Sequence, residues 1–151
     1  MQRRPMRGRV LACVVIFAPL STAHAAEFER PFATPSFVVF IDPTTIVDTA
    51  HDHRRFVQSE VRVASVTHVK IEVDCHGKRF QLRGAKRYQL NGEFVDAMAA
   101  DPIWRADKWS SYYVPLDFVC DWPGSHDAQH KEDASDFWSL ARRTAAQLRE
   151  P

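Results

Sequence analysis

Residues 69–95 constrain the fold more than any other stretch, because they predict three antiparallel strands joined by two tight turns. Val69, Ile71 and Val73 alternate with charged residues, which is the period of a strand with one buried face. His76 and Gly77 interrupt this alternation, and glycine supplies the positive φ that a tight hairpin turn requires. We therefore expect a hairpin at this point.

The alternation also predicts the register of this hairpin. With His76 and Gly77 as the loop, the expected pairs are Cys75 with Lys78, Val73 with Phe80, Ile71 with Leu82, and Lys70 with Arg83. Apolar pairs then share one face of the sheet and charged pairs the other, and a slip of one residue would invert both faces. Cys75 has the parity of the apolar residues, so we expect it to face the core.

Two glycines shape the second half of this meander. Asn91-Gly92 is the strongest short hairpin signal and predicts that Tyr88 pairs with Val95. Gly84 lies in the middle of the predicted strand, where glycine indicates a bulge or the close approach of another backbone. We therefore expect three paired strands with one irregular position.

The first 25 residues have the three parts of a secretory signal peptide. Four arginines precede an apolar run at residues 10–20, and residues 23–25 form an A-x-A site. We predict cleavage after Ala25 and export to the periplasm or the cell surface. A transmembrane anchor is the alternative, but the run falls well short of the roughly 20 residues that span a bilayer. Cys13 lies at the start of the run rather than after it, which argues against a lipoprotein.

Removal of residues 1–25 from the 151-residue chain leaves 126, the size of one domain. It removes 4 of the 20 basic residues and none of the 19 acidic ones, so the net charge changes from +1 to −3. Nucleic-acid-binding domains usually carry a basic excess, so this balance argues against a nucleic-acid partner. No transmembrane anchor is expected once the signal is removed.

Cys75 and Cys120 are the two cysteines of the predicted exported chain. An oxidising compartment favours their pairing, so we predict one intrachain disulfide. Closing a loop of this length in the unfolded chain stabilises the fold by about 4 kcal/mol. The alternatives are two buried free thiols, or a metal site, for which two cysteines supply only half of the four ligands that zinc usually takes.

The rest of the chain predicts a single α+β domain. Residues 36–41 are typical of a buried strand, residues 54–64 alternate as a second strand, and residues 135–150 carry an apolar stripe with helical spacing. We interpret residues 26–35 as a linker and residues 123–134 as a loop. We expect one antiparallel sheet of about five or six strands within residues 36–122. The C-terminal helix, capped by Asp133 or Ser135, packs on this sheet.

The order of several residues resembles the bacterial surface-adhesin protein E family. The resemblance spans roughly residues 36–122 and is carried by Ile41-Asp42, the valine-rich strand at 57–63, Asp74-Cys75, Arg83, Tyr88, Asn91-Gly92, Trp109 and Phe118-Val119-Cys120. It implies an antiparallel sheet with a helix packed on it and a disulfide between the meander and the C-terminal part. It also implies a non-enzymatic surface domain that binds host matrix and plasma proteins and can form a homodimer.

Basic residues of the meander form the predicted ligand-binding group. The cluster consists of Lys70, Lys78, Arg79, Arg83, Lys86 and Arg87. In the expected register, Lys70, Arg79 and Arg83 share the polar face, beside Glu72 and Asp74. This face suits an acidic partner, such as a glycan, a lipid headgroup or a protein surface. The alternative is a solvated face with cross-strand ion pairs, such as Asp74 with Arg79.

Aromatic residues offer a second candidate surface. The group consists of Trp104, Trp109, Tyr112 and Tyr113. These side chains either fill a core between sheet and helix or form an interface, where aromatic residues are enriched.

Histidines supply the remaining candidate chemistry. An extended chain at residues 51–53 would place His51 and His53 on one side, as a metal site requires, with Asp48 or His68 as a further ligand. A solvated loop is the alternative. Cys75-His76 has the residue types of a nucleophile and a base, but neighbouring strand residues point to opposite faces. The sequence contains no serine-hydrolase, nucleotide-binding or metalloprotease motif.

We therefore predict an exported binding module with no catalytic residue, cofactor or metal, whose partner is a protein or an envelope component. One alternative is a periplasmic accessory protein that docks a partner subunit through a sheet edge or an aromatic patch. Another is a small hydrolase or metal-binding protein that uses the histidines.

Overall fold

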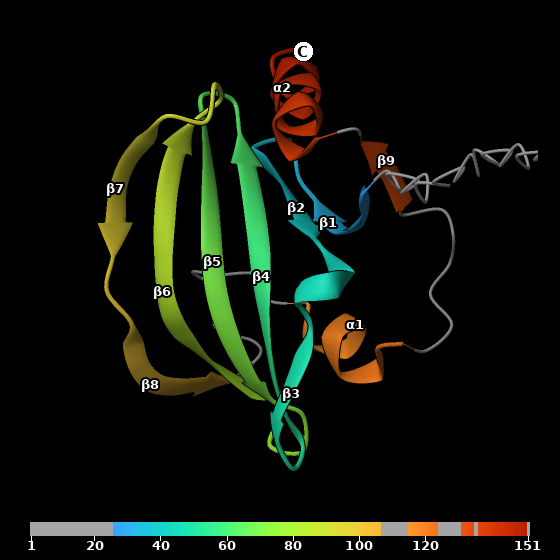
Figure 1. Ribbon diagram of the computed structural model, residues 1–151, viewed down its shortest axis with the longest axis vertical. Helices are drawn as coiled ribbons and strands as arrows, with labels where there is room; N and C mark the ends of the chain where they lie inside the picture. The colour runs from blue at the N-terminus through green and yellow to red at the C-terminus, as the bar shows by residue number, and fades with distance from the viewer. Residues whose placement is uncertain (1–25, 107–114, 124–130, 135, 151) are drawn as a thin grey trace, which may run out of the picture.

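The computed structural model describes residues 26–106, 115–123, 131–134 and 136–150. Within them, nine strands form one antiparallel sheet (Figure 1). The strands are β1 (Ala26–Ala33), β2 (Phe37–Ile41), β3 (Val47–Ala50), β4 (His53–Arg62), β5 (Ser65–Asp74), β6 (Arg79–Gln89), β7 (Phe94–Met98), β8 (Asp101–Ala106) and β9 (Lys131–Ala134). The helices are η1 (Pro43–Thr45), α1 (Leu116–Asp121) and α2 (Phe137–Gln147).

The strand order is β7-β6-β5-β4-β2-β1-β9, with β3 paired to β4 and β8 paired to β6. The predicted antiparallel sheet and C-terminal helix are therefore confirmed, but the expected five or six strands are too few. None of the helices in the described residues is long and apolar enough to span a membrane.

The linker predicted at residues 26–35 is wrong, because most of it forms β1. The loop predicted at residues 123–134 is wrong over its last four residues, which form β9 and pair with β1. Proline made residues 26–35 resemble a linker, since it cannot donate to a strand ladder. The ladder between β1 and β2 is irregular between Glu29 and Phe32, so Pro31 lies where the regular pairing is interrupted.

The predicted register between β5 and β6 is confirmed for Val73 with Phe80 and for Ile71 with Leu82. Beyond this point Lys70 pairs with Gly84 instead of Arg83, because Arg83 is the extra residue of a β-bulge. Gly84 has a φ of 118°, which glycine adopts readily and other residues avoid.

The predicted pairing of β6 with β7 is also shifted by one residue. Tyr88 pairs with Phe94 rather than with Val95, and the irregularity lies between Arg87 and Tyr88. The Asn91-Gly92 turn itself is confirmed between the two strands.

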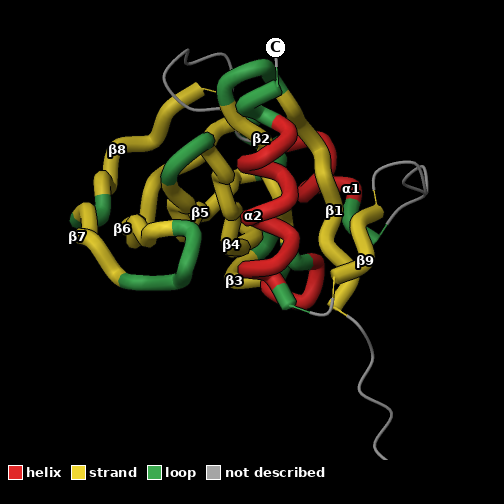
Figure 2. Tube along the Cα trace, turned by 90° about the horizontal axis from the view of Figure 1, so that it is seen from above, coloured by secondary structure: helices red, strands yellow, loops and turns green. Residues whose placement is uncertain are grey.

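Side chains of the central strands alternate between two apolar cores on opposite faces of the sheet. One core contains α1 and consists of Ile41, Phe56, Val69, Ile71, Val73, Phe80, Ala85, Leu116 and Val119. The other contains α2 and consists of Phe28, Val38, Phe40, Val61, Val66, Leu140, Ala141 and Ala145. Figure 2 shows α2 against the strands from above.

The predicted C-terminal helix is confirmed as α2, but its cap is neither Asp133 nor Ser135. Asp136 caps the helix, and its Oδ1 accepts a hydrogen bond of 2.7 Å from the backbone N–H of Ser139. Asp133 belongs to β9, and Ser135 lies outside the described residues.

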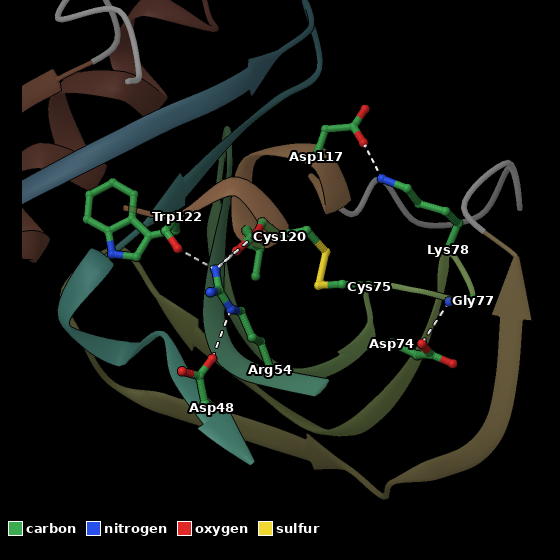
Figure 3. Close-up of a disulfide and its surroundings, with 10 residues drawn as sticks. Asp48, Arg54, Asp74, Cys75, Gly77, Lys78, Asp117, Cys120 and Trp122 are labelled. Carbon is green, nitrogen blue, oxygen red and sulfur yellow. Dashed lines mark hydrogen bonds and ion pairs between the residues drawn. A yellow bond between two sulfur atoms is a disulfide. The ribbon is translucent and has the colours of Figure 1, made fainter. Parts of the chain in front are cut away.

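A disulfide between Cys75 and Cys120 ties α1 to the end of β5, as predicted (Figure 3). Arg54 of β4 supports the same junction, because its Nη1 donates to the backbone carbonyls of Val119, Cys120 and Trp122. Its Nε donates to Asp48 of β3. The disulfide and this guanidinium group both hold the short helix α1 against the sheet.

Candidate ligand-binding groove

A groove with a volume of about 580 Å³ crosses the face of the sheet that carries α2. Its floor comes from β4, β5 and β6, one wall from the start of α2, and another from β7. The residues that give it its chemistry are Lys70, Arg83, Lys86, His68, Tyr88, Phe137, Trp138, Ala97 and Met98. We call this set the basic-aromatic groove. It combines segments that are far apart in the sequence.

His68 is the centre of the aromatic part. Its ring centroid lies 5.2 Å from Tyr88, 5.1 Å from Phe137 and 5.8 Å from Trp138. Its Nδ1 lies 2.8 Å from Oγ of Ser59. Burial lowers the pKa of His68, because it disfavours the charged imidazolium. At neutral pH this histidine therefore contributes an uncharged ring to the groove.

The hairpin turn between β6 and β7 packs against the aromatic wall. A Cβ at Gly92 would lie 3.2 Å from Cε2 of Trp138, and Gly92 has a φ of 90°. Glycine is therefore required here both for the turn and for the close approach of the indole ring.

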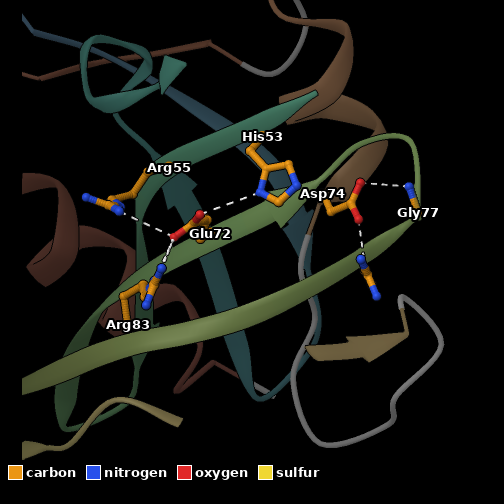
Figure 4. A network of polar contacts seen from close by, with 7 residues as sticks. His53, Arg55, Glu72, Asp74, Gly77 and Arg83 are labelled. Atoms are coloured by element: carbon orange, nitrogen blue, oxygen red, sulfur yellow. Dashed lines mark hydrogen bonds and ion pairs between the residues drawn. The ribbon is translucent and has the colours of Figure 1, made fainter. Parts of the chain in front are cut away.

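Farther from α2, the same face carries a network of ions around Glu72 (Figure 4). Oε2 of Glu72 accepts a bond of 2.6 Å from Nε of Arg83 and lies 3.3 Å from Nη2 of Arg55. Nδ1 of His53 lies 3.6 Å from Oε1. Burial alone would raise the pKa of Glu72, but Arg83 and Arg55 outweigh it and lower the pKa. Glu72 is therefore an ionised, occupied carboxylate.

Asp74 is held in a similar way at the end of β5. Its Oδ1 accepts a hydrogen bond of 2.8 Å from the N–H of Gly77, and its Oδ2 accepts one of 2.8 Å from Nε of Arg79. These two bonds lower the pKa of Asp74. The guanidinium of Arg79 also lies 5.2 Å from the ring centroid of Trp104.

The structure divides the basic residues of the meander into paired and unpaired cations. Arg79 and Arg83 form the ion pairs that sequence analysis gave as the alternative to ligand binding. Lys78 pairs with Asp117 and Arg87 with Asp96. Lys70 lies on the floor of the groove, and Lys86 joins it there. Neither lysine makes an ion pair with a described carboxylate.

The bulge at Arg83 explains why Lys86 was not among the predicted site residues. An unbroken strand would turn Arg87 toward the face of Lys70 and Lys86 away from it. The extra residue reverses this parity, so Lys86 lies opposite His68 and Tyr88 opposite Val66. Gly84 was the sequence signal for this change, although it does not say which neighbouring residue is the extra one.

The metal site considered at His51 and His53 rests on an extended chain that does not exist. Residues 51 and 52 form the tip of the hairpin between β3 and β4, and Asp52 has a φ of 59°. His51 contacts Asp52, whereas His53 faces Glu72 and the edge of Trp104. Within the described residues, no group of three or more His, Cys, Asp or Glu side chains is placed to hold a metal ion.

The other residues considered for a metal or for catalysis are also dispersed. Asp48 binds Arg54 beside α1, while His68 lies in the groove on the opposite face. The disulfide occupies the thiol of Cys75, so Cys75 cannot act as a nucleophile with His76 while it is oxidised. Trp109, Tyr112 and Tyr113 lie outside the described residues.

Comparison with protein-family models, with curated proteins and with solved structures found no match. The resemblance to the surface-adhesin protein E family therefore stays a prediction.

Proposed function

We propose that this protein is an exported binding module whose basic-aromatic groove takes up an acidic ligand. The observation that carries this proposal is the pair of exposed lysines, Lys70 and Lys86, which lack carboxylate partners among the described residues. Arg79 and Arg83 were the predicted companions of Lys70, but Asp74 and Glu72 largely neutralise them. Lys86 is therefore better suited than Arg79 or Arg83 to bind an acidic ligand together with Lys70.

The charge balance of the groove supports an acidic ligand. Two lysines without a described carboxylate partner line it, Lys70 and Lys86, against one carboxylate, Asp42, while the charge of Arg83 is offset by Glu72. Asp42 is already engaged, since its Oδ1 accepts hydrogen bonds from the N–H and the hydroxyl of Thr44. A groove with a positive excess raises the local concentration of anions.

Binding fits the groove better than catalysis does. General acid-base catalysis requires a group whose pKa lies near the working pH. Glu72 and Asp74 have lowered pKa values and arginine partners, so neither carboxylate is suited to transfer a proton near neutral pH. The predicted signal peptide and the disulfide support export, because disulfides persist in oxidising compartments.

Site-specific photo-crosslinking in the producing cell tests this proposal. p-Benzoylphenylalanine is placed at Ala97 in the groove wall and, as a control, at the exposed Arg143 of α2. We expect an adduct with an acidic molecule from position 97 only, and we expect its loss in the variant Lys70→Glu/Lys86→Glu. A neutral or basic adduct, or one that survives both charge reversals, would refute the proposal.

The edge of the sheet favours one second candidate, an accessory protein that docks a partner subunit. Phe94 and Met98 of β7 and Ile103 of β8 have exposed fractions of 56%, 51% and 61%. Large exposed apolar side chains on a sheet edge are typical of an interaction surface. The same crosslinker at Ile103 separates the two functions, because a docked subunit gives a protein adduct there that does not depend on Lys70 and Lys86.

A further inference from the structure

We propose that the ligand of the groove is an amphipathic anion, with a carboxylate or phosphate head and a linear hydrocarbon tail. This inference rests on the proposed function and specifies its ligand class. The head lies between Lys70 and Lys86, and the tail lies along the aromatic wall formed by Tyr88, Phe137 and Trp138.

The position of the lysines in the sheet defines the head site. Lys70 pairs with Gly84, so Lys86 is its diagonal neighbour across the two strands. Diagonal neighbours are about 7–8 Å apart in a sheet, and the long lysine stems let both ammonium groups reach one anion between them. Gly84 also lines the groove beside the two lysines.

The walls of the groove define the tail site. Apolar and aromatic residues form the part of the lining that meets α2 and β7, including Met98 and Ala97 of β7, while Asp42, Thr45, Ser59 and Arg83 are polar lining residues elsewhere in the groove. A volume of about 580 Å³ lies within the range of roughly 300–1,000 Å³ that is usual for small-molecule sites. An anion without a tail would leave this apolar lining in contact with water.

The arrangement of the rings favours a flexible chain over a flat aromatic ligand. The ring of Tyr88 meets those of Trp138 and Phe94 edge to face, and Gly92 lies against the indole of Trp138. Each of these rings is therefore engaged with its neighbours, and their surface is uneven. A hydrocarbon chain follows such a surface, and Met98 adapts to it because its side chain is flexible.

Isothermal titration calorimetry of the exported protein with sodium alkanoates tests the inference. We expect dodecanoate to bind, and decanoate and octanoate to bind about tenfold more weakly at each step of two methylenes. Dodecyl phosphate distinguishes the two sources of the head. If dodecyl phosphate binds more tightly than dodecanoate, the ligand is a lipid phosphate. If it binds more weakly, the ligand is a free fatty acid. Both results support the inference.

Variants separate the contributions of head and tail. We expect Lys70→Glu/Lys86→Glu to weaken dodecanoate binding at least tenfold, whereas Arg143→Glu changes it less than twofold. We expect Met98→Asp, which places a charge beside the tail site at an exposed residue, to weaken dodecanoate binding more than octanoate binding. Circular dichroism establishes that each variant is folded.

Three results would overturn the inference. Equal affinity for acetate and dodecanoate would exclude the tail site but leave an acidic ligand in place. Equal affinity for dodecyltrimethylammonium and dodecanoate would exclude recognition of the anionic head. Absence of binding to both dodecanoate and dodecyl phosphate would overturn the inference alone if the crosslinked adduct at position 97 is acidic, and would overturn the proposed function as well if that adduct is missing.

Discussion

Replacement of Arg54 by methionine tests whether one side chain fixes α1 to the sheet. The Nη1 group of Arg54 donates to the carbonyls of Val119, Cys120 and Trp122 (Figure 3). The last carbonyls of a helix have no partner within the helix. A cation placed at this end also interacts favourably with the helix dipole. Methionine keeps an apolar stem but provides neither the charge nor the donors.

The expected loss can be estimated from these contacts. One NH₂ group carries two hydrogens, so three carbonyls share the equivalent of two charged hydrogen bonds. Each such bond contributes about 1.5 kcal/mol, which gives about 3 kcal/mol in total. The ion pair with Asp48 adds less than about 1 kcal/mol, because the side chain of Asp48 is 78% exposed. This loss is a large part of the roughly 5–15 kcal/mol that stabilises a domain.

Equilibrium unfolding in urea, followed by circular dichroism with the disulfide intact, measures this loss. We expect the free energy of unfolding to fall by about 3 kcal/mol in Arg54→Met and by less than about 0.5 kcal/mol in the surface control Arg143→Met. We expect Asp48→Asn to lie close to the control. A difference of less than about 1 kcal/mol between Arg54→Met and the control would refute the assignment of Arg54 as the support of α1.

Three further changes test other parts of the structure. We expect Glu29→Gln to raise the free energy of unfolding, measured by urea denaturation, by about 1 kcal/mol. The reason is that Oε2 of this buried carboxylate has no hydrogen-bond partner in the described part of the chain. A loss of stability would contradict this prediction. We expect Gly84→Ala to lower the free energy of unfolding by about 1–3 kcal/mol, because alanine is strained at a φ of 118° and its Cβ would lie 3.4 Å from the carbonyl oxygen of Met98. An unchanged urea midpoint would count against the bulge. Burial lowers the pKa of His68 from its ordinary value of 6.5. The contribution of the uncharged His68 ring to the free energy of unfolding is therefore complete above that value, and it is lost as the pH falls toward the folded-state pKa. We therefore expect stability to fall less steeply in His68→Gln than in the wild type between about pH 7.5 and 5, and equal slopes would exclude His68 as the cause.

The strands that were predicted correctly are those whose pattern and turns can be recognised within a short stretch of sequence. Alternating apolar residues and two glycine turns placed β5, β6 and β7 next to one another, and the register was correct for the pairs of Val73 with Phe80 and Ile71 with Leu82. Alternation cannot locate an extra residue, because the pattern on either side of a bulge still has a period of two. The site was therefore only partly predicted, since the bulge decides that Lys86 and Tyr88 face the groove.

Elements stabilised by distant partners were not predicted. The helix α1 has six residues and no side-chain cap at its start, so the fold rather than its own sequence stabilises it. The four residues of β9 form a strand only because β1 pairs with them. The walls of the groove come from α2 and β7, and no local pattern in either segment indicates that they face each other.

The pairing of β1 with β9 has a consequence for how the chain reaches its folded state. The hairpins of β4, β5 and β6 pair residues that are close in the sequence and therefore form early. In contrast, β9, which pairs with the outer edge of β1, lies about 100 residues later in the chain. Until then, the outer edge of β1 is an unpaired template for other chains. Because α2 follows β9 directly and packs on Phe28 of β1, the same late segment closes this edge and covers its apolar face. A chain that emerges from its N-terminus is therefore most prone to aggregate just before β9 and α2 emerge.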